Sequence, residues 1–276
     1  GEQENDAELA KKYAELADIF VMDAFGTSHR KHASTYGVAE YSDCVCSGIL
    51  FASELKALNK VMKDPNHPMV AIVGGSKVST KLSILDALSD KVDQLILGGG
   101  IANTFLKAQG FEIGKSLCED NFLTSAEKII KKLEKRGASL PIISDVICGK
   151  LLTEDEPATI KDISEVDSDD MIFDLGKNSM DGITKIVQSA KTILWNGPIG
   201  VFEFKQFSNG TELLADAIAK SNAFSLAGGG DTIAAIEKFK VENNISYIST
   251  AGGAFLEFVE GKKLPAIEIL EKKCQS

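Results

Sequence analysis

The sequence predicts an α/β protein in which helices cover both faces of a parallel sheet. Five short apolar runs end in glycine-rich turns, at residues 69–75, 94–100, 192–200, 223–230 and 245–253. Most of these runs are followed by a helical pattern, and strand–helix alternation is typical of a parallel sheet. The length of 276 residues corresponds to about two domains of ~150 residues each.

Composition excludes several function classes. Hydrophobic residues make up 44% of the chain and charged residues 25%, which is typical of a globular protein. The net charge of −10 repels phosphate backbones, so we expect no nucleic-acid partner. No apolar run reaches the ~18 residues that a membrane span requires, and the acidic start is unlike a signal peptide. The five cysteines are odd in number, which favours a reducing compartment and buried structural thiols.

The remaining elements follow in chain order. Residues 5–17 repeat apolar positions at helical spacing after an Asn-Asp pair that can cap a helix. We expect a buried strand at 18–25, a polar loop at 26–37 and a helix at 47–63. The Pro-containing segment 64–68 ends that helix and is a candidate connection between domains. The stretch 117–190 is charged and less patterned, and its acidic part predicts a solvated structural loop.

The glycine-rich turns predict a ligand crevice. In parallel sheets the ligand lies at the carboxyl ends of the strands, and glycine permits positive φ and close backbone approach there. The chain lacks the P-loop pattern, and Asn103 occupies the third position of a Gly-x-Gly-x-x-Gly pattern. The crevice is therefore expected to bind its ligand without either of the two standard phosphate loops.

Two lysines follow the first of these turns. Lys77 and Lys81 are four residues apart, so on a helix their ammonium groups would share one face and repel each other. A polyphosphate at the helix N-terminus would relieve that repulsion. The alternative is that both are ordinary surface lysines.

Three further positions are compatible with a magnesium nucleotide. Asp231 follows three glycines and is either a helix cap or a carboxylate for Mg²⁺, with Thr232 adding a hydroxyl to a phosphate. Glu203 follows another strand-end turn and is either a surface residue or a ligand for ribose hydroxyls. Pro198 and the backbone of Gly98–Gly100 could form an apolar slot for a base.

One dense basic cluster interrupts the acidic chain. His29, Arg30, Lys31 and His32 lie before the candidate connector, and the arginine fork suits a carboxylate or phosphate. The alternative is a solvated loop face. An anion site in one domain and a nucleotide site in the other indicate phosphoryl transfer, which relies on positioning and charge neutralisation.

The chain resembles the phosphoglycerate kinase family over essentially its whole length. The matching stretches occur in the family's order and are DAFGTSHRKHAST, AIVGGSKVSTK, LILGGGIANTF, TILWNGPIGVFE, SLAGGGDTIAAI and YISTAGGAFLEFVEGKKLPA. The resemblance implies Mg²⁺-dependent phosphoryl transfer from 1,3-bisphosphoglycerate to ADP, which yields 3-phosphoglycerate and ATP in cytoplasmic glycolysis. The partners it implies are these small molecules, and we expect a monomer.

The resemblance also implies the domain organisation. Family members have two Rossmann-like parallel-sheet lobes that are joined by a helix and close by hinge motion. On this scheme residues 1–67 belong to the amino-terminal, phosphoglycerate-binding lobe and include the connecting helix at about 47–63. Residues 68–264 form the nucleotide-binding lobe, and the tail 265–276 returns to the amino-terminal lobe.

Site residues are carried over by motif match. Lys81 resembles the family's nucleotide-phosphate lysine, and Lys77 resembles the lysine that follows the transferred phosphoryl group. Glu203 matches the ribose-binding glutamate, and Asp231 the metal-binding aspartate. The other nucleotide-binding positions implied are Gly75, Gly98, Gly99, Asn196, Pro198, Gly229, Gly230 and Thr232.

Two more residues are implied for the acid substrate and the reaction, namely Arg30 on the glycerate phosphate and Gly252 as a catalytic backbone position. Ala251 departs from the family, which usually has glycine there; its methyl group is tolerated if φ is negative. The family's Arg-Asp-Asn-Pro and His-Leu-Gly-Arg-Pro loops are also not in this sequence. We therefore expect an incomplete amino-terminal lobe and a chain that binds nucleotide without turnover; the alternative is a non-catalytic nucleotide-binding or interaction module.

Overall fold

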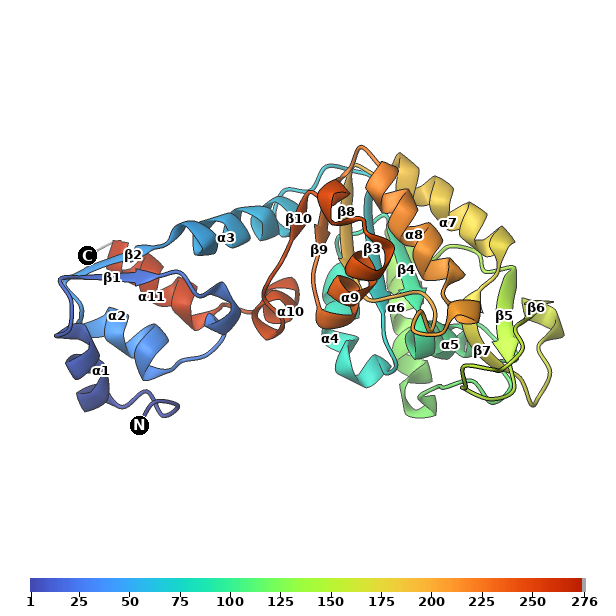
Figure 1. Cartoon of the computed structure of the whole chain (residues 1–276), viewed down its shortest axis with the longest axis horizontal. Helices are drawn as coiled ribbons and strands as arrows, with labels where there is room; N and C mark the ends of the chain where they lie inside the picture. The colour runs from blue at the N-terminus through green and yellow to red at the C-terminus, as the bar shows by residue number, and fades with distance from the viewer. Residues whose placement is uncertain (275–276) are drawn as a thin grey trace. The chain divides into compact units, whose positions relative to one another are not determined.

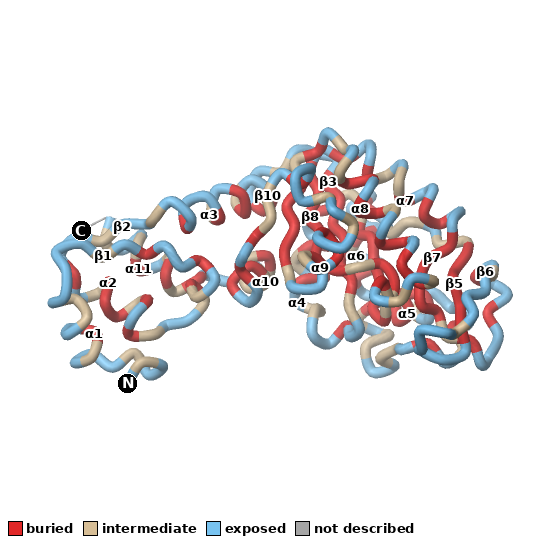
Figure 2. Tube along the Cα trace, viewed as in Figure 1, coloured by how far each residue is buried: buried red, intermediate tan, exposed pale blue. Residues whose placement is uncertain are grey.

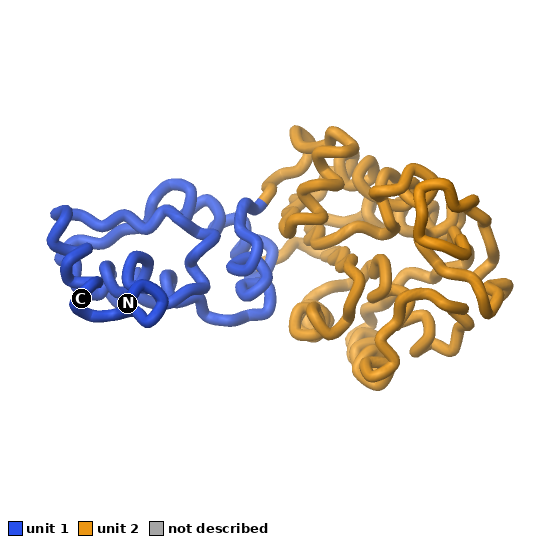
Figure 3. The backbone as a smooth tube through the Cα atoms, turned by 60° about the horizontal axis from the view of Figure 1, so that its bottom comes forward, with its two compact units in different colours: residues 1–63, 249–276 blue, residues 64–248 orange. Residues whose placement is uncertain are grey.

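The computed structural model describes residues 1–274 and divides the chain into two compact units (Figure 3). The first unit comprises residues 1–63 and 249–276, and the second comprises residues 64–248. Residues 249–264, which the sequence assigned to the nucleotide-binding lobe, thus group with the first unit. The functional assignment of each range remains a prediction.

The second unit is built on a five-stranded sheet in which every neighbouring pair is parallel. Its order is β10-β9-β8-β3-β4, and its strands are β3 (Met69–Gly74), β4 (Gln94–Gly98), β8 (Thr192–Asn196), β9 (Phe224–Ala227) and β10 (Tyr247–Ile248). These are the five strands that the sequence predicts. Because all of them run in one direction, their glycine-rich ends lie along a single edge of the sheet.

Both faces of this sheet are covered. Every residue of β3 is buried, although alternate side chains of a strand point to opposite faces. Val70 and Ile72 pack in a core that includes Met180 and Ile183 of α7 and Leu214 of α8. Figure 2 shows burial throughout β3 and β8. A continuous apolar run such as MVAIVG is typical of a strand buried on both sides.

The helices of the second unit alternate with the strands (Figure 1). They are α4 (Leu82–Ser89), α5 (Gly99–Ala108), α6 (Leu123–Lys135), α7 (Lys177–Ser189), α8 (Asn209–Lys220) and α9 (Gly230–Phe239). The predicted helical patterns after 75, 100 and 230 correspond to α4, α5 and α9. Helix α4 begins later than expected, because a short 3-10 turn at Val78–Thr80 precedes it.

The stretch 117–190 is more ordered than the sequence indicates. It contains α6 and α7 and a three-stranded antiparallel sheet in the order β6-β5-β7, with β5 (Asp145–Gly149), β6 (Thr159–Asp162) and β7 (Met171–Leu175). The expected acidic loop therefore includes a strand. Its buried Asp170 forms ion pairs with Lys150 and Lys161 at 2.7 and 2.6 Å, so two lysines balance the charge of this buried carboxylate.

The first unit contains a two-stranded parallel sheet of β1 (Ile19–Met22) and β2 (Cys44–Ser47). The strand expected at 18–25 is present as β1, but the prediction that it is buried is wrong. Only Met22 of β1 is buried, and Val21 is 50% exposed. The reason is that β1 has one neighbouring strand. The helices are α1 (Ala7–Ala14), α2 (Val38–Tyr41), α3 (Ile49–Met62), α10 (Gly253–Val259) and α11 (Pro265–Cys274).

Three local expectations in this unit have clear outcomes. The Asp6 side chain caps α1 by accepting a hydrogen bond from the Leu9 amide at 2.9 Å. The loop expected at 26–37 is partly helical, with a 3-10 turn at Phe25–Thr27 and a π-helical turn at Ala33–Gly37. Helix α11 packs on β2 and α2; residues 275 and 276 of the predicted tail lie outside the described residues.

The cysteines are free, as expected for a reducing compartment, but most of them are not buried. Cys44, Cys46 and Cys274 are exposed, Cys118 is partly buried and only Cys148 is buried. The prediction of buried thiols fails for the first unit, where Cys44 and Cys46 lie on β2 of the two-stranded sheet and Cys274 is the last residue of α11. Within residues 1–274, no helix is long and apolar enough to cross a membrane.

Candidate functional site

The carboxyl edge of the five-stranded sheet brings together loops that are far apart in the sequence. The ends of β3, β4, β8 and β9 carry Gly74–Gly75, Gly98–Gly99, Asn196–Pro198 and Gly228–Thr232. The Gly99 amide donates to the Ile199 carbonyl at 2.8 Å, and the Ile101 amide donates to Gly75 at 3.1 Å. These loops therefore support one another directly.

Close packing between these loops explains part of the glycine pattern. A Cβ added to Gly74 or to Gly98 would overlap the carbonyl oxygen of Pro198. These two glycines are thus required by chain–chain contact as well as by any ligand. The slot expected between Pro198 and the 98–100 backbone is closed at Gly98, because the two backbones touch there. Pro198 itself is only partly buried, so its outer side remains accessible.

Other glycines at this edge are required by their backbone conformation or leave open space. Gly75 and Gly229 have φ values of +152° and +99°, which side-chain-bearing residues rarely adopt. A Cβ added to Gly230 would meet no atom within 4 Å. The open side of Gly230 is consistent with the close backbone approach that a ligand would need.

Lys81 is the central cation of this edge. Its Nζ donates to the Gly74 carbonyl at 2.6 Å, to the Asn196 Oδ1 at 2.7 Å and to the Asn196 carbonyl at 3.2 Å. Burial lowers the pKa of Lys81 to about 8, and the negative charge of Asp231 partly offsets this decrease. A polyphosphate would restore the charged form, since an adjacent anion favours the ammonium.

Lys77 does not share a helix face with Lys81, and this corrects the i,i+4 argument. The 3-10 turn at Val78–Thr80 separates them, and α4 begins only at Leu82. Lys77 is exposed and lies near Glu119, whose pKa is lowered by hydrogen bonds from Ser79 and also by the charge of Lys77. The two lysines therefore present one half-buried and one exposed ammonium.

Asp231 lies in the first turn of α9 and is exposed. The position that caps this helix is Gly229, which has no side chain for the purpose, so the alternative of a simple capping aspartate is not borne out. The carboxylate is open to a metal ion, and Mg²⁺ is usually held by one or two carboxylates together with substrate phosphates.

Thr232 and Asn196 hold the β8 and β9 loops together. The Thr232 hydroxyl donates to the Gly228 carbonyl at 2.9 Å and accepts from the Gly197 amide at 2.7 Å. The Asn196 amide donates to the same Gly228 carbonyl at 2.7 Å. Thr232 is buried, so the predicted phosphate contact of its hydroxyl would compete with two existing hydrogen bonds.

Glu203 is exposed at the far end of the loop after β8. Lys238 of α9 donates to the carbonyl of Phe202 at 2.5 Å, which fixes the backbone beside Glu203. The glutamate carboxylate thus has a supported backbone and free access to solvent, as a ribose ligand would need.

The residues predicted for the acid substrate belong to the first unit. Arg30 is exposed, and its carbonyl accepts a hydrogen bond from the Thr35 hydroxyl at 2.9 Å. The basic cluster is dispersed, because Lys31 lies over the Tyr36 ring at 4.5 Å and His29 is partly buried. Arg30 is therefore available to an anion while its neighbours are engaged elsewhere.

Gly252 and Ala251 lie just before α10. A Cβ added to Gly252 would meet nothing within 4 Å, so its backbone is open. Ala251 is buried and is not among the residues with positive φ, which means that its methyl group is accommodated without backbone strain. The adjacent Thr250 amide and hydroxyl both donate to the buried Glu54 of α3 at 2.9 Å, a pairing that the sequence pattern did not indicate.

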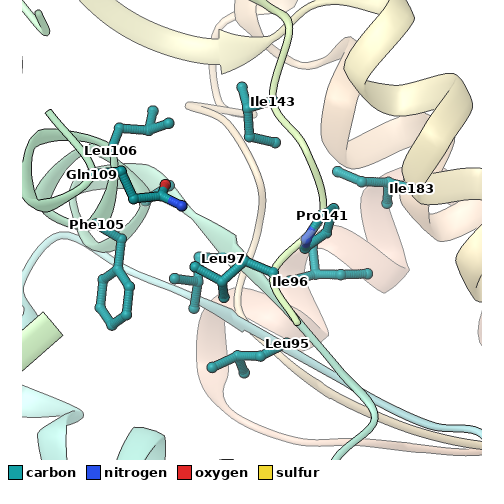
Figure 4. A pocket seen from close by; sticks show the side chains of 11 residues that line it. Leu95, Ile96, Leu97, Phe105, Leu106, Gln109, Pro141, Ile143 and Ile183 are labelled. Carbon is teal, nitrogen blue, oxygen red and sulfur yellow. The ribbon is translucent and has the colours of Figure 1, made fainter. Parts of the chain in front are cut away.

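A small apolar cavity lies elsewhere in the second unit (Figure 4). It is bounded by β4, α5, the segment 140–143 and Ile183, with Gln109 as its polar side chain. Its volume is about 30 Å³, comparable to the space of one water molecule. It is too small for a nucleotide and is not a candidate site.

Comparisons with known proteins agree with this geometry. A family model described as phosphoglycerate kinase matches residues 1–262. A curated phosphoglycerate kinase from Francisella philomiragia is 58% identical over 273 residues, which cover 99% of this chain and 70% of that protein. The structure of phosphoglycerate kinase from Coxiella burnetii matches with a TM-score of 0.96 and 57% identity, over 99% of this chain and 70% of that one. A crystal structure of the enzyme from Pyrococcus horikoshii OT3 matches with a TM-score of 0.82 and 29% identity, over 98% and 69% of the two chains.

The parallel-sheet fold and these relatives place the chain among the kinases, which are enzymes of the transferase class. The chain belongs to the phosphoglycerate kinase family.

Proposed function

We propose that the second unit binds Mg-ADP or Mg-ATP at the carboxyl edge of its sheet, for phosphoryl transfer between 1,3-bisphosphoglycerate and ADP. The products are 3-phosphoglycerate and ATP, the partners are these small molecules, and the setting is cytoplasmic glycolysis. The observation that carries the proposal is the half-buried Lys81 ammonium, which joins the ends of β3 and β8 within the electrostatic reach of Asp231.

Each residue then has a defined task. Lys81 neutralises nucleotide phosphates, and Lys77 is free to follow the transferred phosphoryl group because it is exposed. Asp231 would hold the magnesium ion, which supplies charge neutralisation to the phosphates. Gly229 and Gly230 let the phosphates approach the backbone at the start of α9, where free amides favour anions.

Other residues would recognise the nucleoside and the acid substrate. Glu203 would accept hydrogen bonds from the ribose hydroxyls, and Pro198 would contact the base. In the first unit Arg30 would hold the phosphate of the glycerate, and the open backbone at Gly252 would face the reacting phosphoryl group. Phosphoryl transfer needs no protein nucleophile, so positioning and charge account for the chemistry.

The proposal is tested by calorimetric titration of Mg-ADP into the chain and into its Asp231→Ala and Glu203→Gln variants. We expect saturable binding that weakens about tenfold or more in Asp231→Ala, because one charge-assisted contact is removed. Asp216→Ala is a matched control, since Asp216 is an exposed aspartate on α8 that pairs with Lys220. Absence of binding by a folded chain contradicts the proposal. A coupled assay for ATP formation then separates an enzyme from a binding module.

A further inference from the structure

Asp174 is a buried carboxylate that the proposed mechanism does not use. It lies on β7 and is 2% exposed. Its Oδ2 accepts from the Gly210 amide at 2.7 Å, and its Oδ1 accepts from the Leu175 amide at 2.9 Å. None of the ion pairs within residues 1–274 includes Asp174, and burial raises its pKa to about 7. The protein thus keeps an acid in its interior without a cationic partner.

Two glycines make room for this carboxylate. A Cβ added to Gly200 or to Gly210 would overlap the Asp174 carboxyl group. Gly210 lies in the first turn of α8, and Gly200 lies in the loop that leads from β8 to that helix. Asp174 therefore occupies the notch where loop 197–203 meets α8.

The same loop is bonded to both elements around Asp174. The Val201 amide donates to the Phe173 carbonyl of β7 at 2.8 Å. The Ile199 and Gly200 amides donate to the Thr211 hydroxyl of α8 at 3.2 Å. Loop 197–203 therefore lies where β7 and α8 meet, and both elements are labelled in Figure 1. Loop 197–203 carries Pro198 and Glu203, which are the proposed contacts to base and ribose.

Asp145 provides an internal comparison. It is also buried and is the acceptor for the first turn of α7, from the Ser179 amide at 2.7 Å and the Asn178 amide at 3.0 Å. A Cβ on Gly176 would overlap it, just as one on Gly210 would overlap Asp174. The carboxylate of Asp145 is bonded to α7, whereas that of Asp174 is bonded to α8 and also lies against Gly200 of loop 197–203.

We propose that Asp174 is a positioning residue for nucleoside recognition. Its carboxyl group packs against Gly200 of loop 197–203 and accepts a hydrogen bond from the Gly210 amide of α8, so it sets where the loop lies against that helix. This inference rests on the proposed nucleotide site. Lys81 and Asp231, the proposed phosphate and metal residues, are held by β3, β8 and α9 instead. Loss of the Asp174 carboxylate should therefore weaken binding of the nucleoside part and spare binding of the phosphates.

The test uses Asp174→Asn and the control Asp145→Asn, each titrated with Mg-ADP and with Mg-pyrophosphate. Asparagine keeps the shape but turns one oxygen into a donor that opposes an amide N–H, and an unsatisfied buried donor is costly. We expect Asp174→Asn to weaken Mg-ADP binding about tenfold and to leave Mg-pyrophosphate binding within about twofold. Asp145→Asn should lower the thermal midpoint while leaving both dissociation constants within about twofold of the unmodified chain.

The outcomes separate the two proposals. Failure of the unmodified chain to bind Mg-ADP overturns the proposed function. If the chain binds and Asp174→Asn binds Mg-ADP equally well, or loses both ligands equally, the positioning role is wrong. If Asp174→Asn does not fold, Gly210→Ala takes its place. The three nearest atoms that a Cβ there would meet all belong to the Asp174 carboxyl group, and Gly210 lies on α8 outside the loop, so this variant must show the same selective loss.

Discussion

Strands β1 and β3 are both apolar in sequence, yet they differ in how far their side chains are buried. β3 has a strand on each side and is buried along its whole length, whereas β1 has β2 as its neighbour and only Met22 is buried. A groove of about 580 Å³ also lies between β2, α3 and α11 of the first unit. The difference shows that an apolar run predicts a strand, while its burial is decided by the number of neighbours that long-range contacts provide.

The largest expected effect comes from truncating one apolar side chain to alanine in each of the two strands. Ile72→Ala in β3 should lower the free energy of unfolding by about 2–5 kcal/mol, because it leaves a cavity in a closed core. Val21→Ala in β1, where the side chain is half exposed, should change it by less than about 0.5 kcal/mol. Far-UV circular dichroism in urea measures both. Equal losses would show that the first unit is as tightly packed as the second.

The two buried aspartates should give stability opposite dependences on pH. The pKa of Asp174 is raised from 3.8 to about 7 by burial, so its contribution is complete below the unfolded value and is lost as pH rises through 7. The pKa of Asp145 is lowered by hydrogen bonds despite its burial, so its contribution is present above 3.8 and is lost as the solution is acidified below that value.

The measurement is urea unfolding followed by the fluorescence of Trp195, the single tryptophan of the chain, which lies in the second unit. Between pH 4 and 7 the stability of the unmodified chain relative to Asp174→Asn should fall by up to about 4 kcal/mol, at ~1.4 kcal/mol per pKa unit. Over the same range the difference from Asp145→Asn should stay level. A level difference for Asp174→Asn would mean that its carboxyl group is not perturbed.

The thiols should distinguish the units by reactivity. Burial raises the pKa of Cys148 in the second unit to about 11 from 9.0, while Cys44 and Cys46 in the first unit are exposed. At pH 8 the thiolate of Cys148 should be about a hundredfold scarcer than that of an unperturbed thiol, so alkylation of Cys148 should be much slower than that of the exposed cysteines. Mass spectrometry after timed iodoacetamide treatment gives the rates. Comparable rates would indicate that the second unit opens readily.

The smallest expected effect concerns Lys81. Because its pKa is about 8, the ammonium is lost as pH rises above that value, and Mg-ADP affinity should fall by up to about tenfold per pH unit. Lys81→Arg keeps its charge, so its affinity should be level between pH 7 and 9. If both proteins show the same pH profile, the dependence arises from another group.

The sequence predicts the sheet better than it predicts the details of the site. The five strands of the large sheet were visible because each apolar run ends in glycine, a local signal. The Lys77–Lys81 geometry was not, because a 3-10 turn separates the two residues and the ammonium of Lys81 bonds to Asn196 on another strand. Asp174 was missed since MIFDLG lies in a charged stretch where the strand signal is weak, and its role depends on Gly200 and Gly210.

The resemblance supplied the family, and the packing of the loops explains why the matched residues have their identities. Gly74 and Gly98 must be glycine because any Cβ there would overlap the Pro198 carbonyl. The spacing of residues in the sequence could not indicate this contact. Whether Asp231 caps α9 could be decided only from the residue at which the helix begins, and the capping position is Gly229. Local pattern thus locates candidate residues, while long-range contact decides which atoms of each are free to act.

Hydrogen exchange with and without Mg-ADP would show whether the nucleotide binds at the carboxyl edge of the large sheet. We expect increased amide protection in residues 74–81, 196–203 and 228–232, with little change in β1 and β2. Protection confined to the first unit, or no change under conditions where the titration shows binding, would contradict it.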